Sequence, residues 1–169
     1  AEPSVSRAEA LSKRGIAAYD AGQFAEALRH FDEAYRLDPN DGSILMLRGW
    51  TYTKLGRCKE AIADLDAFED SLIVSDSMVY AEVYRTRAYC HMQLKDHVAA
   101  AGDLEEQVRF KPDDDWAWAT LGRAYGLLKR YGESEAALKR AIKLNPDDPY
   151  ANYQLGLVYL MSGRASEAI

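Results

Sequence analysis

A period of 34 residues constrains this chain more than any other feature of its sequence. Pro112 and Pro146 are 34 positions apart, and the same interval separates Gly15 from Gly49. A unit of this length cannot bury a hydrophobic face by itself, so successive units must stack and share one core. The chain is therefore predicted to be an array of small structural repeats.

The period is interrupted once. Pro39 and Pro112 are 73 positions apart, which is two periods plus five residues. With this offset, Ala88 takes the place that glycine holds in the other repeats. The predicted organisation is a flank at 1–7, repeats at 8–41 and 42–75, an irregular junction at 76–80, repeats at 81–114 and 115–148, and a partial repeat at 149–169.

Each repeat is predicted to contain two amphipathic helices. In "WAWATLGRAYGLL" (116–128), Trp118, Leu121 and Tyr125 recur at helical spacing, and a second apolar stripe runs through "YGESEAALKRAIKL" (131–144). Small residues such as Gly122 and Ser134 leave room for the two helix axes to approach each other. The pattern predicts an all-α fold of antiparallel helix pairs.

Polar residues mark the expected helix starts. "SRAE" at 6–9 has the spacing of a capping box, with Ser6 at the N-cap. Asp148 followed by Pro149 is an N-cap followed by a proline at the first helical position. The triple "DDD" at 113–115 is assigned to helix capping rather than to a metal site, because carboxylates are favourable at helix N-termini.

The pattern resembles the tetratricopeptide repeat. "WATLGRAYGLLKRYGESEAALKRAIKLNP" (118–146) carries that family's order of large, leucine, glycine, tyrosine, small, large, alanine and proline positions, and "LSKRGIAAYDAGQFAEALRHFDEAYRLDP" (11–39) is nearly as complete. The resemblance covers residues 8–169 and implies a right-handed α-solenoid superhelix. The departures from the family pattern are Arg14, Arg48 and Arg87 for leucine, Ala18 and His91 for tyrosine, and Asn152 for a large residue.

The irregular junction has unusual residues on both sides. Phe68 occupies a position where Ala34 and Ala141 stand in other repeats, and Ile73 replaces a proline. Phe68 is expected to be buried and to push the following helix outward, with the extra residues lengthening the connection or adding a helical turn. Gln107 at the same small position suggests that the third repeat is also irregular. The alternatives are a tolerated loop insertion and a specific ligand contact.

Composition excludes several classes of protein. The chain has 169 residues, a net charge of −6 and a mean hydropathy of −0.37. The acidic balance argues against a nucleic-acid binder, and no apolar run approaches the length of a membrane span. Cys58 and Cys90 are interpreted as reduced thiols packed between helices. The expected location is the cytoplasm, with removal of an upstream signal segment left open.

No catalytic or cofactor-binding motif is visible. The glycine spacing matches neither a dinucleotide fingerprint nor a phosphate loop. His30, His91 and His97 lack the spacing of metal ligands, and His91 falls in a core tyrosine position. We therefore expect no catalytic residue, no metal and no cofactor, and the chain is not predicted to be an enzyme. An array of helical repeats that reads RNA bases is a further alternative, and the acidic balance of the chain argues against it.

The first helix of each repeat is expected to expose one face, which lines a concave groove in tetratricopeptide proteins. Aromatic, methionine and arginine side chains gather there, and these types are enriched at recognition surfaces. Trp50 is expected to anchor a partner, together with Tyr89 and Trp116. The predicted binding residues are Ile16, Tyr19, Met46, Trp50, Arg85, Tyr89, Met92, Trp116, Arg123, Tyr150, Tyr153 and Leu157.

Some tetratricopeptide adaptors clamp the carboxyl terminus of chaperones with lysine, arginine and asparagine in this groove. Of the matching positions here, only Arg85 suits, so no such clamp is expected. The positions read Ser12, Ile16, Leu47, Glu82 and Thr86 in the first three repeats, and Arg85, Tyr89, Thr120, Tyr150 and Gln154 in the last three.

The sequence thus favours a protein-interaction scaffold that binds an extended or helical partner segment with apolar and aromatic anchors. The alternative is a regulatory or assembly region of a larger enzyme or secretion machine. The last repeat stops inside its second helix, which predicts a fragment of a longer array or self-association through this end. Leu155 and Tyr159 are the side chains expected to seek a partner there.

Overall fold

The computed structural model describes residues 4–71 and 77–167. In these ranges the regular structure is entirely helical, which confirms the predicted all-α fold. The chain divides into two compact units, Ala1–Asp76 and Ser77–Ile169. Unit 1 contains α1 (Ser4–Asp20), α2 (Phe24–Leu37), α3 (Gly42–Lys54) and α4 (Cys58–Asp70), and unit 2 contains α5 (Ser77–Gln93), α6 (His97–Phe110), α7 (Asp115–Leu127), α8 (Tyr131–Leu144), α9 (Pro149–Met161) and the short 3₁₀ helix η1 (Ala165–Glu167).

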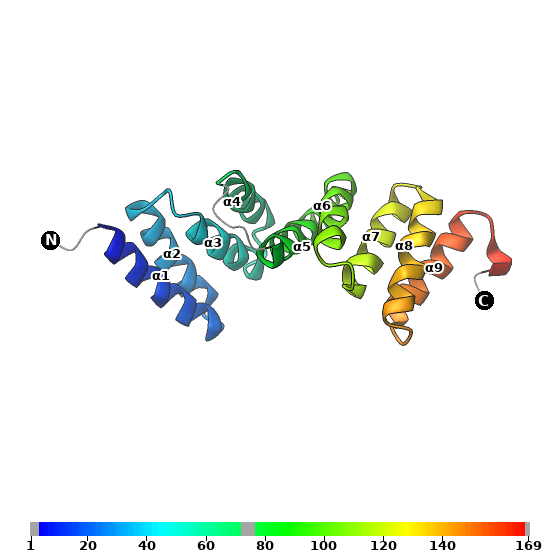
Figure 1. The fold of residues 1–169 in the computed structure, drawn as a ribbon, viewed down its shortest axis with the longest axis horizontal. Helices are drawn as coiled ribbons and strands as arrows, with labels where there is room; N and C mark the ends of the chain where they lie inside the picture. Colours follow the sequence, from blue (N-terminus) through cyan, green and yellow to red (C-terminus); the bar gives the residue numbers. More distant parts are fainter. Residues whose placement is uncertain (1–3, 72–76, 168–169) are drawn as a thin grey trace. The chain divides into compact units, whose positions relative to one another are not determined.

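Unit 1 consists of two antiparallel helix pairs, α1 with α2 and α3 with α4 (Figure 1, blue to green). Their close approach depends on glycine, as the sequence predicted. A Cβ atom at Gly15 would lie 2.6 Å from Cε1 of Phe31, and one at Gly49 would lie 2.8 Å from Cγ of Leu65. Both large partners are completely buried. Each glycine therefore makes room for the large side chain of its partner helix.

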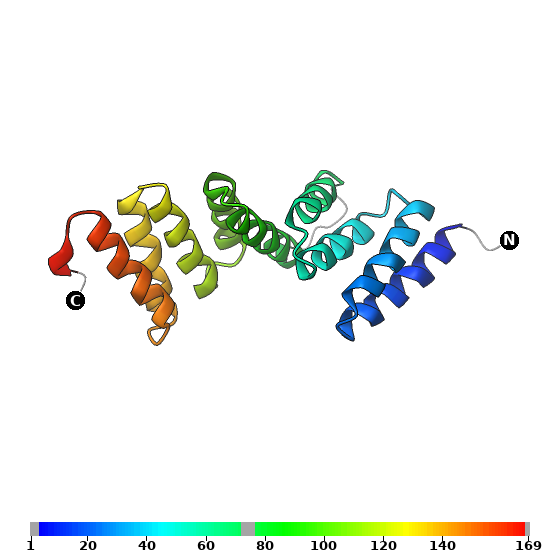
Figure 2. The same cartoon turned by 180° about the vertical axis from the view of Figure 1, so that it is seen from behind.

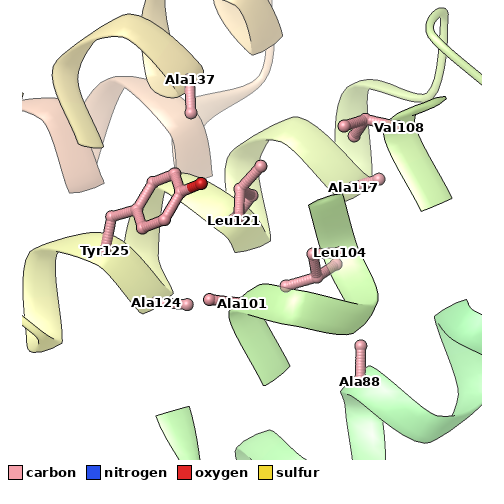
Figure 3. Packing of buried hydrophobic residues seen from close by; sticks show 9 residues of the cluster. All are labelled: Ala88, Ala101, Leu104, Val108, Ala117, Leu121, Ala124, Tyr125 and Ala137. Carbon is pink, nitrogen blue, oxygen red and sulfur yellow. The ribbon is translucent and has the colours of Figure 1, made fainter. Parts of the chain in front are cut away.

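Unit 2 continues the pattern with α5 paired with α6 and α7 with α8, while α9 packs against α8 (Figure 2). Its core is a cluster of apolar side chains contributed by α5, α6, α7 and α8 (Figure 3). The cluster consists of Ala88, Ala101, Leu104, Val108, Ala117, Leu121, Ala124, Tyr125 and Ala137. Five of these residues are alanines and four are larger, so the helices can pack closely around the larger side chains.

Of the predicted junction at 76–80, residues 77–80 are helical. Phe68 is 1% exposed, which confirms its predicted burial. Ile73 and Asp76 lie outside the described residues. Helix α5 starts at Ser77 and has 17 residues, as α1 at the start of the chain has, whereas α3, α7 and α9 have 13 each. The insertion thus adds a turn to α5, one of the two outcomes that we expected, whereas the outward displacement of this helix stays a prediction.

Aspartates cap the first helices of three repeats. The side chains of Asp41, Asp114 and Asp148 accept hydrogen bonds from backbone N–H groups in the first turns of α3, α7 and α9. The capping assignment of the acidic triplet at 113–115 is confirmed at Asp114. The capping box at Ser6 was wrong, because α1 begins at Ser4 and Ser6 is already inside the helix.

Helix α9 corrects a second expectation. Tyr159 is only 8% exposed, because its ring packs toward α8 and its hydroxyl donates to Oε1 of Glu135 over 3.2 Å. Leu155 is half-buried. The apolar side chains that α9 exposes are instead Tyr153, Leu160 and Met161.

No helix in the described ranges has the length and apolar character needed to cross a membrane.

Candidate functional site

In unit 1, the predicted binding residues lie on α1 and α3 with different degrees of exposure. Ile16 is exposed, whereas Met46 and Trp50 are half-buried. Tyr19 makes an edge-to-face contact with Phe24, with ring centroids 5.3 Å apart. Burial, and secondarily Asp20, raises the pKa of Tyr19. The indole nitrogen of Trp50 is buried and has no hydrogen-bond partner among the residues that the structure describes.

In unit 2, two predicted residues from different helices are brought into contact. The guanidinium of Arg85 on α5 lies 4.7 Å from the ring centroid of Trp116 on α7, a cation–π geometry. The same guanidinium lies 3.7 Å from Asp114 and 3.9 Å from Glu82. Trp116 also packs against the unit 2 core. Arg85 therefore connects the cap of α7 to the aromatic residue beside it.

The remaining predicted residues of unit 2 divide into exposed and packed side chains. Tyr89 is 43% exposed, Tyr153 is 63% exposed, and Arg123 is also exposed. Met92 packs against the unit 2 core, and Tyr150 packs against the alanines of a second buried cluster. Leu157 is half-buried. The exposed tyrosines and the Arg85–Trp116 pair are side chains of the types that are enriched at recognition surfaces, because they offer large amphipathic contact areas.

The structure explains two of the three arginines that depart from the tetratricopeptide pattern, whereas Arg14 is exposed. In unit 1, Nε and Nη2 of Arg48 donate to the two carboxylate oxygens of Asp64 over 2.6 and 2.8 Å. Arg87 binds Asp103 in the same way in unit 2. Hydrogen bonding to Asp64 raises the pKa of Arg48. Each aspartate follows its arginine by 16 positions, and the recurrence of this interval in two repeats is the signal that the sequence offers, whereas the contact depends on how the two helices pack.

A groove that the sequence reasoning missed lies in unit 2 between α6, α7 and α8. It has a volume of about 570 Å³. The hydroxyl of Tyr125 donates to Oε1 of Glu105 over 2.6 Å, and burial together with this carboxylate raises the pKa of Tyr125. Figure 3 shows Tyr125, Leu121, Val108 and Ala137 around this region. The lining residues are Glu105, Val108, Trp118, Leu121, Tyr125, Glu133, Ala136, Ala137 and Arg140.

The groove lies on the opposite side of α7 from the predicted binding residues. Successive residues of an α-helix are rotated by about 100°, so Trp116 and Arg123 share one face of α7. Trp118, Leu121 and Tyr125 lie on the other face by the same geometry. The sequence pattern had assigned these three residues only to helix packing. Unit 2 therefore has two candidate surfaces, one on each side of α7.

Known proteins with the same architecture include a MamA fragment from Desulfovibrio magneticus RS-1, at 24% identity and a TM-score of 0.84, covering 95% of this chain and 88% of that one. YrrB, described as a tetratricopeptide protein with an unusual peptide-binding site, gives a TM-score of 0.86 at 16% identity, covering 94% of this chain and 79% of that one. At these identities the likeness shows the fold.

Sequence relatives are longer proteins. The human protein O-mannosyl-transferase TMTC1 is 27% identical over 108 residues, which is 64% of this chain and 12% of that protein. The Hsp70-Hsp90 organizing protein of Triticum aestivum is 27% identical over 117 residues, which is 69% of this chain and 19% of that protein. The chain thus spans less than a fifth of the length of either relative.

Two family models match the chain. A tetratricopeptide repeat model matches residues 12–72 and a second one matches residues 122–163, so that together they cover more than half of the sequence. The matched segments contain the glycine-dependent helix pairs of unit 1 and the pairing of α7, α8 and α9 in unit 2. The repeat, the fold and the family models agree, and the chain belongs to the tetratricopeptide repeat family.

Proposed function

We propose that this chain is a protein-interaction scaffold whose first helices bind a partner segment with apolar and aromatic anchors. The observation that carries the proposal is the Arg85–Trp116 pair, which stands near the exposed Tyr89 on the same helix as Arg85. Tyrosine, tryptophan and arginine dominate binding hot spots. The peptide-binding description of YrrB and the chaperone-organizing name of the wheat relative are consistent with this role.

A carboxylate clamp is not the recognition mode that we propose. Arg85 is the only clamp-type side chain at the matching positions, and Asp114 and Glu82 already lie within 4 Å of its guanidinium. Its charge is compensated within the chain, so a partner carboxylate would compete with two others. Apolar contact with the exposed rings fits the surface better than recognition of a carboxyl terminus.

Capture of partners from a cell extract, identified by mass spectrometry, tests the proposal. Partners retained by the wild-type chain should be lost with Tyr89→Ala or Trp50→Ala, because truncating a hot spot costs about 2 kcal/mol or more. Arg109→Ala, on an exposed position of the second helix α6, serves as the matched control and should retain them. Identical retention by all four folded proteins would contradict the proposed surface.

A second candidate function has its own support. The match to an O-mannosyl-transferase covers 12% of that protein, so a segment of this kind occurs within a larger enzyme. In this alternative, the repeats are a regulatory or assembly region that packs against other parts of the same protein. The full reading frame that contains this segment would distinguish the two functions, since a catalytic domain in it would favour the second.

A further inference from the structure

The groove of unit 2 corresponds to a space that is filled in unit 1. Repeats one and two relate to repeats three and four by a constant shift of 73 positions. By this shift Leu121 corresponds to Arg48 and Ala137 corresponds to Asp64. The two repeat pairs therefore differ at the positions where unit 1 has its buried arginine and that arginine's main carboxylate.

In unit 1, Arg48 occupies the space between α2, α3 and α4. Besides its two hydrogen bonds to Asp64, its Nη1 lies 3.2 Å from Oδ1 of Asp32. Its guanidinium carbon is 4.2 Å from the ring centroid of Tyr35 and 5.9 Å from that of Tyr52. The side chain of Arg48 is 13% exposed. A guanidinium among carboxylates and aromatic rings is the arrangement that this space selects.

Unit 2 keeps part of that environment, since Ala137 replaces Asp64 and Val108 replaces Tyr35. Tyr125 corresponds to Tyr52, Glu105 corresponds to Asp32, and Arg130 stacks on Tyr125 at 4.2 Å as Arg57 stacks on Tyr52 at 4.6 Å. The shorter Leu121 and Ala137 leave the groove of about 570 Å³.

The charges around the groove come from both of its rims. On the α6 side, Glu105 accepts from Tyr125 and forms no ion pair with any described residue. On the α8 side, Glu133 is held by Arg130 through two hydrogen bonds, and Arg140 also lines the groove. Glu105 is therefore the rim carboxylate that forms no ion pair with a described residue, and the charge of Arg130 acts on it from a greater distance. It stands at the position where Asp32 meets Arg48.

We propose that this groove binds an arginine side chain presented by a partner protein segment. The aliphatic part of arginine would lie against Leu121, Val108 and Trp118, and its guanidinium would pair with Glu105 beside the ring of Tyr125. The partner would thereby supply in trans the group that Arg48 supplies in cis in unit 1. This site is separate from the surface of the first helices, because it uses the other face of α7.

Nuclear magnetic resonance titration of the isotope-labelled chain with N-acetyl-argininamide tests the proposal. Saturable shifts are expected at the backbone amides of Val108, Leu121 and Ala137, and N-acetyl-lysinamide should produce weaker ones because ammonium lacks the planar stacking surface. Absence of shifts at these amides, or equal binding of the two probes, would overturn the proposal.

Two variants sharpen the test. Leu121→Arg combined with Ala137→Asp transplants the unit 1 pair and should abolish binding of the arginine probe, because the chain then fills its own groove. Glu105→Gln, at an exposed position where misfolding is not expected, should weaken binding about tenfold by removing a charge-assisted contact. Undiminished binding to either folded variant would refute the assignment of the site. Tyr89→Ala, at an exposed position of α5, should leave the titration unchanged, which separates this site from the proposed scaffold surface.

The reciprocal experiment opens a groove in unit 1. Arg48→Leu combined with Asp64→Ala places in unit 1 the residues that unit 2 has at the corresponding positions. The arginine probe should then produce new shifts at the amides of Tyr35, Tyr52 and residue 64. A folded double variant without new shifts would contradict arginine as the occupant that the space selects.

Discussion

At the residue scale, the stability of unit 1 depends on matched buried charges. Arg48 and Asp64 are 13% and 11% exposed at their side chains, so each depends on the other to compensate for lost hydration. Repeat four has leucine and alanine at the same positions, which shows that the fold accepts either an ion pair or an apolar pair there. Mixed combinations leave one charge buried without its partner.

We expect Arg48→Leu alone to destabilise the chain by about 3–5 kcal/mol, because Asp64 would lose its bidentate partner. Adding Asp64→Ala should recover most of this loss, since the apolar pair of repeat four is then reproduced. Urea unfolding followed by circular dichroism measures both values. A double variant as unstable as the single one would show that the arginine acts through something other than charge pairing.

At the element scale, glycine sets the distance between paired helices, because it places no side chain between them. In unit 2, a Cβ atom at Gly122 would lie 2.5 Å from Cγ of Leu138 and 3.2 Å from the carbonyl oxygen of Ser134. The hydroxyl of Ser134 donates to the carbonyl oxygen of Gly122 over 2.6 Å, which holds α8 against α7. These contacts leave no space for a methyl group.

Gly122→Ala should therefore destabilise the chain by about 1–3 kcal/mol through overpacking, although alanine favours helix more than glycine does. Gly102 on α6 is the matched control, because nothing lies within 4 Å of a Cβ placed there. Gly102→Ala should stabilise the chain by about 0.5–1 kcal/mol. Thermal unfolding of the two variants checks the opposite signs, and a loss of similar size in both would exclude helix packing as the cause.

The segment that follows α9 is attached to α8 through a charged contact, because Arg164 pairs with Glu135. Hydrogen bonds from Lys139 and then from Arg164 lower the pKa of Glu135 to about 2. A carboxylate with a lowered folded-state pKa contributes stability above its unfolded pKa, near 4.5, and loses that contribution as the pH falls toward 2.

The stability difference between the wild type and Glu135→Gln should accordingly be largest at neutral pH and should shrink between pH 4.5 and about 2. Denaturant unfolding at a series of pH values measures it. Glu9→Gln is the comparison variant, because Glu9 pairs with Lys13 within α1 and its pKa is also lowered by that lysine, but the pair joins no two helices. A difference that does not depend on pH would contradict the electrostatic attachment.

At the scale of the whole molecule, α9 presents apolar side chains without cover. Tyr153, Leu160 and Met161 are 63%, 55% and 51% exposed. Exposed apolar groups of this size favour association, because each Leu-sized side chain gains about 1.5–3 kcal/mol on full burial. We therefore propose that this chain self-associates through α9.

Light scattering over a range of concentrations should show dimers of the wild-type chain, and Leu160→Glu combined with Met161→Glu should shift it to a monomer. Both substitutions are at exposed positions, so they should leave the unfolding temperature unchanged within a few degrees. A wild type that stays monomeric at high concentration, with α9 protected from hydrogen exchange, would show that this helix needs no partner.

The repeat itself follows from local information in the sequence. Helical periodicity, capping aspartates and glycines at 34-residue spacing predicted the helix pairs, because each depends on residues close in the chain or on one repeated contact. The burial of Phe68 was also predictable, because its position in the repeat was known. The features that the sequence did not predict depend on contacts between helices.

Only the tertiary structure decided how the unusual residues are used. Arg48 appeared in the sequence as a departure from the family pattern, and its pairing with Asp64 became visible when α3 and α4 were packed together. Tyr159 was expected at an exposed edge, but packing against α8 buries it. The groove of unit 2 exists because Leu121 and Ala137 are both small relative to the space between three helices. Periodicity predicts which face of a helix is buried, whereas the volume and charge enclosed between helices depend on the partners that packing brings together.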